Sequence, residues 1–416
     1  MHIDNLADYK TATRIQLNDV FIIATGPHGF PGASQILCQS LRELQSCGCI
    51  ATYVGAKEPF LFRTVGSAGV RVVIPPEITG SAIGPERAVA THDVLLICRL
   101  SQAIIEEALN IHKVAKGGIW IWGTYLFPYG VAALMAKRAL STMGHKTHLW
   151  VTPTGSDVWE IGTQLSALAG SLLADEAITR VLTYTASFAS EIQDRFGITR
   201  EIDSLYPILD QNRFKPVSGS EKMKMRAELG IKQSSFVISS HSNMRPVKRP
   251  LDVIAVAQKV AAESKREIVL LMIGPDDLIS VPESLNAGAA RVIWTGLVGR
   301  VESLLTASDI ELNCSVHDSF NLSLAESMCC GLPCVSTDIV GIAPEIVSCG
   351  GGYLYSLARP SEGMQAAAEY IAALASDEEL REAVGRRAAD HASRVFSRTR
   401  ILQQFRLAML ADSDSL

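Results

Sequence analysis

A cluster of basic residues follows a short apolar run in the second half of the chain. Residues 237–240 form a predicted buried strand, after which come Arg245 and Lys248. The two cations would emerge at the carboxyl end of that strand, where α/β sheets bind their ligands. Fixed cations there can hold a diphosphate and stabilise it as it leaves. A solvated basic loop is the plain alternative, and the position between a strand and a helix favours the binding role.

Two carboxylates, Asp318 and Glu326, stand eight residues apart around a predicted helix. Asp318 can cap this helix, whose apolar members are Leu322, Leu324 and Met328, and the first-turn amides would then point at a bound anion or sugar. At about 1.5 Å per residue, Glu326 would lie about 12 Å further along the axis. That separation suits one carboxylate on a sugar ring and another on a ribose. A cap and a surface charge are the plain alternative.

A glycine-containing loop follows the first predicted strand. Gly32 in this loop would let a phosphate or a sugar approach the backbone just before a helix begins. An ordinary strand–helix turn explains the loop equally well. The loop lacks the full G-x-G-x-x-G spacing, which counts against a dinucleotide site.

Short apolar runs alternate with helical patterns along almost the whole chain. Strands that alternate with helices predict βαβ units and a mainly parallel sheet. The pattern breaks near residues 210–224, where turn-forming residues predict a domain joint. The predicted fold class is therefore α/β, with two doubly wound, Rossmann-like domains facing a central cleft. The predicted strands are residues 20–24, 70–74, 94–98, 119–122, 148–152 and 180–184, then 237–240, 268–273, 292–294, 310–314 and 333–336.

The composition excludes several classes of protein. With 38 Lys and Arg residues against 43 Asp and Glu residues, the net charge of −5 argues against a dedicated nucleic-acid binder. No apolar run reaches about 18 residues, so no membrane-spanning helix is expected. Charged residues near the start give no sign of a signal peptide. The nine cysteines lack metal-ligand spacing, which predicts reduced thiols in a cytoplasm and no metal site.

Three segments, in this order, resemble the C-terminal domain of the retaining glycosyltransferases of family 4, which have the GT-B fold. They are Ser242-Asn243-x-Arg245-Pro246-Val247-Lys248-Arg249, the stretch from Asp318 to Glu326, and Cys330-Gly331-Leu332-Pro333-Cys334-Val335. The Asp/Glu pair is similar to that family's E-x7-E motif. Other segments most resemble the branch that makes N-acetylglucosaminyl malate for bacillithiol, namely Tyr125-x-x-Pro128, Gly155-Ser156-Asp157 and residues 207–214.

The resemblance implies a role for each candidate residue. Arg245 and Lys248 would bind the donor diphosphate, and Asp318 would hold hydroxyls of the transferred sugar; these three are the catalytic candidates. Glu326 would bind the ribose hydroxyls, and Gly32 would lie under the phosphates. The remaining donor candidates are Gly296, Leu297, Val298, Phe320, Asn321 and Leu322, and the acceptor candidates are Tyr125, Thr154, Ser156 and Asp157.

This sequence departs from the family pattern at four places. Asp318 stands where a Glu is usual, and Asn321 stands where a Gly often follows the Phe. Thr154 replaces a usual histidine, and the paired glycines of the first loop are reduced to Pro31-Gly32. Three of these changes border the reacting sugar, so the donor sugar or the acceptor can differ from those of the bacillithiol branch.

The resemblance implies that the chain is a retaining glycosyltransferase without a cofactor. Metal dependence is not expected, because no D-x-D-type carboxylate pair lies beside the proposed phosphate site and two cations already neutralise it. Residues 1–215 would bind the acceptor, residues 216–395 the donor, and residues 396–416 would form a helix that packs back on the first domain. The expected donor is UDP-linked N-acetylglucosamine or a related hexose, and the acceptor a small hydroxy acid or polyol. No nucleic acid or stable membrane insertion is expected, and a homodimer stays open.

Two other functions stay open from the sequence. One is a natural-product glycosyltransferase that acts on an aminocyclitol, a sugar or a thiol. The other is a catalytically silent protein that binds nucleotide-sugars. No general base is assigned, because the departing phosphate can itself take the proton of the acceptor.

Overall fold

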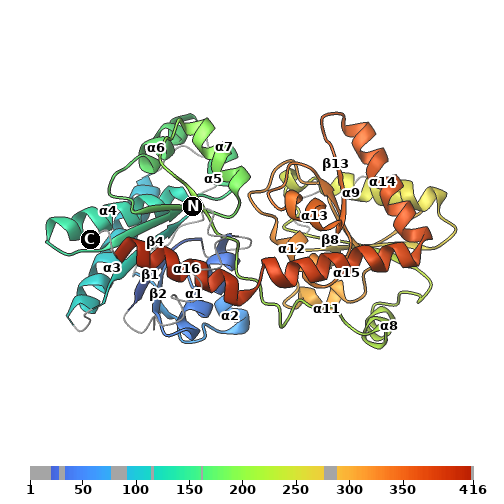
Figure 1. The fold of residues 1–416 in the computed structure, drawn as a ribbon, viewed down its shortest axis with the longest axis horizontal. Coiled ribbons are helices and arrows are strands. Elements are labelled where there is room, and N and C mark those ends of the chain that lie inside the picture. Colours follow the sequence, from blue (N-terminus) through green and yellow to red (C-terminus); the bar gives the residue numbers. More distant parts are fainter. Residues whose placement is uncertain are drawn as a thin grey trace. The chain divides into compact units, whose positions relative to one another are not determined.

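The computed structural model describes residues 20–27, 33–75, 91–113, 117–160, 163–275 and 288–413 (Figure 1). The chain divides into two compact units, one of Met1–Ile208 with Arg398–Leu416 and one of Leu209–Ser397. The joints therefore fall at residues 208–209 and 397–398, where the sequence suggested 215–216 and 395–396. Each unit is built on a parallel sheet, so the predicted α/β class with two such domains is confirmed.

The first unit contains a seven-stranded sheet in the order β3-β2-β1-β4-β5-β6-β7. Its central strands β1, β4 and β5 are buried along their whole length because helices cover both faces. Buried side chains of α3, α4, α6 and α7 pack on one face, and those of α1 and α16 pack on the other. The strands are β1 (Phe21–Thr25), β2 (Ile50–Val54), β3 (Arg71–Val73), β4 (Ile119–Thr124), β5 (His148–Thr152), β6 (Arg180–Thr183) and β7 (Asp203–Ser204).

The helices of the first unit are α1 to α7 and one further helix, α16, which comes from the end of the chain. A π-helical turn, η4 (Leu126–Gly130), follows β4. The helices are α1 (Ala33–Ser46), α2 (Phe60–Val65), α3 (Thr91–His112), α4 (Val131–Thr142), α5 (Ser156–Trp159), α6 (Thr163–Leu173), α7 (Ala186–Phe196) and α16 (Arg398–Ser413). In Figure 1, α16 is drawn in red among the blue and green elements of this unit.

One predicted strand of the first unit is wrong. Residues 94–98 lie inside helix α3, where Val94 and Leu95 are exposed. A run of five apolar residues fits a buried strand or a helix segment equally well. The longer pattern decides for the helix, because Ile97, Leu100 and Ile104 recur at helical spacing and are buried.

A buried carboxylate ties α16 to the first unit. Asp412 accepts hydrogen bonds from the indole nitrogens of Trp150 and Trp120, at 2.5 and 3.4 Å. Arg180 of β6 pairs with the same carboxylate at 2.7 Å. Phe405 of α16 packs against Trp150 with ring centroids 6.1 Å apart. The final helix is therefore part of the core of the first unit.

The second unit contains a six-stranded sheet in the order β10-β9-β8-β11-β12-β13. The strand order reverses between β8 and β11, and α/β sheets bind ligands at the carboxyl ends of strands beside such a reversal. The strands are β8 (Phe236–His241), β9 (Ile268–Ile273), β10 (Arg291–Gly296), β11 (Ile310–Asn313), β12 (Cys334–Thr337) and β13 (Gly352–Tyr355). The helices are α8 (Gly219–Glu228), η5 (Pro246–Lys248, a 3-10 turn), α9 (Pro250–Glu263), α11 (Val301–Leu305), α12 (Leu322–Cys329), α13 (Ala343–Cys349), α14 (Pro360–Ser376) and α15 (Glu378–Val395).

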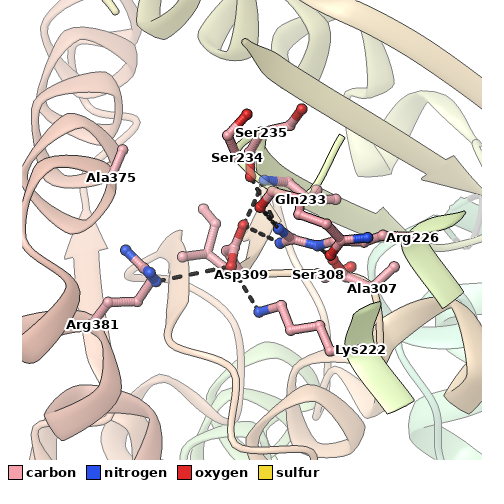
Figure 2. A network of polar contacts seen from close by, with 12 residues as sticks. Lys222, Arg226, Gln233, Ser234, Ser235, Ala307, Ser308, Asp309, Ala375 and Arg381 are labelled. Atoms are coloured by element: carbon pink, nitrogen blue, oxygen red, sulfur yellow. Dashed lines mark hydrogen bonds and ion pairs between the residues drawn. The ribbon is translucent and has the colours of Figure 1, made fainter. Parts of the chain in front are cut away.

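A second buried carboxylate, Asp309, stands at the amino end of β11, opposite the end where ligands are expected (Figure 2). It pairs with Arg226 and Lys222 of α8, each at 2.7 Å, and Arg381 of α15 lies 3.9 Å away. Its carboxylate also accepts a hydrogen bond from the amide of Val237 at 2.7 Å. Although burial opposes ionisation, the two α8 cations hold the pKa of Asp309 below its usual range. This network fastens α8 and α15 to the sheet.

Among the described helices, none combines the length and the low polarity that crossing a lipid bilayer requires.

Candidate functional site

The predicted basic loop leaves the carboxyl end of β8 and lies beside the loop that follows β11. Arg245 directly precedes η5, and Lys248 ends it. The amide of Val316, after β11, donates to the carbonyl of Val247 at 3.0 Å. This hydrogen bond joins the two loops at the reversal point of the sheet. The loops that carry the predicted cations and the predicted carboxylate are therefore neighbours.

Lys248 and Asp318 form an ion pair, although they stand seventy residues apart in the chain. Their side chains keep 16% and 17% of their surface exposed, so a ligand can reach both. Removing one member of a largely buried ion pair leaves the other charge without a partner, which is costly unless another charged group takes its place. A ligand that brings its own negative charge can therefore replace Asp318 as the partner of Lys248.

The predicted role of Asp318 as the cap of α12 is wrong, because Asn321 caps this helix. The side-chain oxygen of Asn321 accepts from the amide of Leu324 at 3.1 Å. Asp318 precedes the first helical residue by four positions, and its Oδ1 accepts instead from the amides of Phe320 and Asn321, at 3.2 and 2.9 Å. Since Asp318 is not on the helix, the estimate of its separation from Glu326 along the axis does not apply.

Arg245 belongs to the same charged group of residues, as the behaviour of His317 indicates. Burial, opposed by Asp318 and assisted by Lys248 and Arg245, lowers the pKa of His317 to about 4. The imidazole next to Asp318 is therefore neutral at physiological pH. Arg245, Lys248 and Asp318 all act electrostatically on this imidazole, so they lie around it at the same end of the sheet.

Glu326 lies in a different environment from Asp318. It is 5% exposed and its Oε2 lies 3.1 Å from Nε2 of His241, the last residue of β8. The other ring nitrogen of His241 lies 2.9 Å from Glu311 of β11. We did not predict His241 or Glu311 from the sequence. The signal was present, since Glu311 interrupts the predicted strand 310–314 and His241 directly follows the predicted strand 237–240.

The remaining donor candidates differ in how they could meet a ligand. Gly296 ends β10 with a φ of 62°, and Leu297 after it is 48% exposed. Phe320 is 1% exposed and packs edge-on against Phe396, so only its backbone could reach a donor. Val298 and Leu322 are half-buried. Gly32 lies outside the described residues.

At the edge of this site, the backbone of Gly274 lies very close to the backbone of Ser242. A side chain on Gly274, at the end of β9, would place its Cβ 1.8 Å from the carbonyl oxygen of Ser242. The amide of Gly274 also donates to the carbonyl of Gly296 at 3.1 Å. Only glycine lets the ends of β8, β9 and β10 lie this close together.

The acceptor candidates of the first unit lie after β4 and β5, which are neighbours in its sheet. The carboxylate of Asp157 accepts from the amide of Leu126 at 2.5 Å and from the amide of Thr154 at 2.6 Å. Burial raises the pKa of Asp157 to about 7, while these hydrogen bonds oppose the shift. Tyr125 and Ser156 are half-buried beside it. Asp157 thus holds two loops together, and its contact with an acceptor stays a prediction.

Among the described residues, no three His, Cys, Asp or Glu side chains are grouped so that they could hold a metal ion.

Residues 221–391 match the family described as "Glycosyl transferases group 1". They form a group 1 glycosyltransferase domain. This range contains β8, β11 and α12, which carry the basic loop, Asp318 and Glu326. The resemblance predicted from the sequence motifs is confirmed for this domain.

Curated relatives extend the similarity over most of the chain. The N-acetyl-alpha-D-glucosaminyl L-malate synthase of Bacillus anthracis is 26% identical over 317 residues, which are 76% of this chain and 78% of the relative. The D-inositol 3-phosphate glycosyltransferase of Kribbella flavida is 22% identical over 391 residues, which are 88% of this chain and 89% of the relative. The predicted similarity to N-acetylglucosaminyl malate synthases is thereby confirmed.

Solved structures extend the comparison of the fold to nearly the whole chain. Anabaena HepE in complex with UDP and glucose matches with a TM-score of 0.72 at 18% identity, over 94% of this chain and 99% of that one. The structures it resembles are GT-B glycosyltransferases, so the GT-B fold predicted from the sequence is confirmed.

Asn321 provides a test of how the loop before α12 is held. Its φ of 78° lies in the left-handed region, and its side chain caps the helix. We expect Asn321→Ala to lower the unfolding free energy by about 2 kcal/mol, because the cap is lost and alanine is strained at this φ. Asn321→Gly should cost less than about 1 kcal/mol, since glycine accepts the φ. Calorimetry of the full chain measures both, with the exposed Asn212→Ala as control; equal losses for alanine and glycine would contradict this account.

Proposed function

We propose that this glycosyltransferase moves a hexose, with retention of configuration, from a UDP-linked donor to a small polar acceptor. The observation that carries the proposal is the accessible Lys248–Asp318 pair, with Arg245 beside it, at the reversal point of the sheet. A nucleotide-sugar brings both chemistries that this pair can bind. Its diphosphate needs cations, and its sugar hydroxyls need a carboxylate acceptor.

In the proposed reaction the leaving diphosphate is the main electrostatic problem. As the bond between the sugar and the diphosphate breaks, negative charge grows on the phosphate oxygens and the sugar becomes positively charged. Lys248 would exchange Asp318 for the diphosphate, and Arg245 would add a second cation. Asp318 would then be available for the sugar hydroxyls. The departing phosphate can take the proton of the acceptor, so no protein base is needed.

The relatives support the donor and acceptor classes in the proposal. The Bacillus anthracis relative is named for a product that joins N-acetylglucosamine to malate, and the Kribbella flavida relative for an inositol phosphate acceptor. Anabaena HepE was solved with UDP and glucose. We therefore expect UDP-N-acetylglucosamine or UDP-glucose as donor, a hydroxy acid or a polyol as acceptor, and action in the cytoplasm without a metal or a cofactor.

Product formation is the direct test of the proposal. The full chain would be incubated with UDP-, GDP- and ADP-sugars, each with a mixture of hydroxy acids, polyols and aminocyclitols, and analysed by mass spectrometry. We expect a glycosylated product with a UDP-sugar in the presence of EDTA. Donor binding without any product would favour the catalytically silent alternative, and a requirement for Mg²⁺ or Mn²⁺ would contradict the metal-free mechanism.

The two cations should be the most sensitive positions. We expect Arg245→Ala or Lys248→Ala to lower turnover by about a hundredfold or more, because each removes a charge-assisted contact to the leaving group. Lys259→Ala, an exposed lysine of α9 in the same unit, is the matched control and should leave turnover unchanged. Near-normal turnover in both cation variants would rule out their assignment to the phosphates.

Substitutions of Asp318 and Glu326 should remove contacts to opposite ends of the donor. We expect Asp318→Asn to lower transfer while leaving the affinity for UDP nearly intact, because Asp318 meets only the sugar. Glu326→Gln should weaken UDP and the UDP-sugar alike by about tenfold or more, which is the value of a charge-assisted hydrogen bond. Titration calorimetry with UDP measures both variants. An equal loss of UDP affinity in the two variants would contradict the two-ended arrangement.

A further inference from the structure

Three buried side chains from three elements form a chain of hydrogen bonds that ends at Glu326. Glu311 of β11 is 1% exposed, His241 ends β8, and Glu326 lies in the middle of α12. Nδ1 of His241 lies 2.9 Å from Glu311 and Nε2 lies 3.1 Å from Glu326. Both ring nitrogens thus face carboxylates, so the ring must carry two protons to donate to both.

The imidazole is held in its charged form. Burial by itself lowers the pKa of His241, but Glu311 and Glu326 more than offset burial and raise the pKa to about 10. The ring therefore donates to Glu326 throughout the physiological pH range. Other titratable groups close enough to act on Glu326 are Arg213 and the thiols of Cys329 and Cys330, and burial raises the pKa of both thiols.

The Glu311 end of this series of hydrogen bonds is fixed to the sheet. One oxygen of Glu311 accepts from the backbone amide of His241 at 3.0 Å, and the other accepts from the hydroxyl of Ser239 at 2.6 Å. Glu311 therefore has a single orientation, and it fixes the plane of the imidazole. On the side of α12, the hydroxyl of Ser323 donates to the carbonyl of His241 at 2.6 Å. The helix that carries Glu326 is thus tied to β8 through both the ring and the backbone of His241.

The charge balance of this group differs from that of the Asp309 network, although Asp309 precedes Glu311 by only two residues. Here two carboxylates share one imidazolium, whereas Asp309 is surrounded by Lys222, Arg226 and Arg381. A buried group with excess negative charge is costly, and a buried ion pair is by itself weak evidence for a stabilising role. Excess negative charge is useful where a ligand supplies hydrogen-bond donors, as the hydroxyls of a ribose do.

We propose that Glu311 and His241 are positioning residues that orient the Glu326 carboxylate for the ribose hydroxyls of the donor. The inference rests on the proposed function, because it requires a nucleotide at this end of the sheet. Glu311 fixes the ring, the ring fixes one oxygen of Glu326, and the carboxylate is set before the nucleotide arrives. Neither residue needs to touch the donor.

The test is the pH dependence of UDP binding by the Glu311→Gln variant of the full chain. The glutamine oxygen can still accept from Nδ1, but the ring loses one of its two negative partners and its pKa falls. As the pH rises, the neutral ring turns a lone pair toward Glu326 and stops holding it. We expect the ratio of variant to wild-type Kd for UDP to rise about tenfold between pH 6.0 and 8.5. The titration of UDP itself cancels in this ratio.

Asp309→Asn is the matched control, because it disturbs a buried charge network beside the same strand that involves Lys222 and Arg226 of α8 instead of His241 and Glu326. We expect it to lower thermal stability while the Kd ratio stays constant with pH. If Glu311→Gln does not fold, His241→Gln replaces it. That amide is uncharged and does not titrate, so it holds Glu326 less strongly than the imidazolium does, and the Kd should rise by a constant factor across the same pH range.

The outcomes separate the inference from the function on which it rests. A constant Kd ratio for Glu311→Gln, or an unchanged Kd for His241→Gln, would overturn the positioning role while leaving the nucleotide site in place. Failure of the wild-type chain to bind UDP would overturn the proposed donor and this inference together. A pH-dependent ratio in Glu311→Gln and not in Asp309→Asn would support the inference.

Discussion

The parallel pairing of β8 with β11 is the constraint on which the candidate site depends. Ile310 pairs with Ile238 and Glu311 with Ser239, so the two strands run in register and their carboxyl ends meet at one edge. The chain needs seventy residues to travel from Lys248 to Asp318, yet the pairing brings them into contact. The same register places Glu311 beside His241. This one strand pairing therefore brings together the basic loop, the candidate sugar-binding carboxylate and the buried histidine.

Two charged groups of the second unit differ in how far solvent can reach them. At the amino end of β11, Asp309 is buried among cations and the amide of Val237, and removing one partner of such a group is costly, about 3–5 kcal/mol. The Lys248–Asp318 pair keeps 16% and 17% of its side-chain surface exposed, whereas Asp309 keeps 4%. A pair that still reaches solvent can exchange one partner for a charged ligand.

The first unit also places its candidate residues beside a reversal of strand order, but these residues differ in chemistry from those of the second unit. Its strand order also reverses, between β1 and β4, and the loops after β4 and β5 are joined by Asp157. This carboxylate accepts hydrogen bonds from backbone amides, so the candidate sites of the two units differ in kind. The candidate site of the second unit has charged side chains that solvent can reach, and that of the first has two loops held together by a buried acid. The group 1 family match lies within the second unit.

The sequence by itself determined the α/β class, most of the strands and the basic loop. These depend on local signals, namely apolar runs between helical patterns and cations directly after a strand. It also carried the family motifs, because their residues are contiguous or eight apart. The prediction from sequence failed where one pattern fits two kinds of element. Residues 94–98 by themselves fit a strand, and only the longer helical spacing of α3 identifies them as part of a helix.

Only the tertiary structure decided which residues act together. The cap of α12 belongs to Asn321 because the helix begins at Leu322, a boundary that the spacing of Asp318 and Glu326 does not fix. His241 and Glu326 stand 85 residues apart, and His241 and Glu311 stand 70 apart. No pattern along the chain links them, because their contact arises only when β11 pairs with β8 and α12 packs behind it. Residue types are local properties of a sequence, whereas the hydrogen-bond partner of Glu326 is a property of the fold.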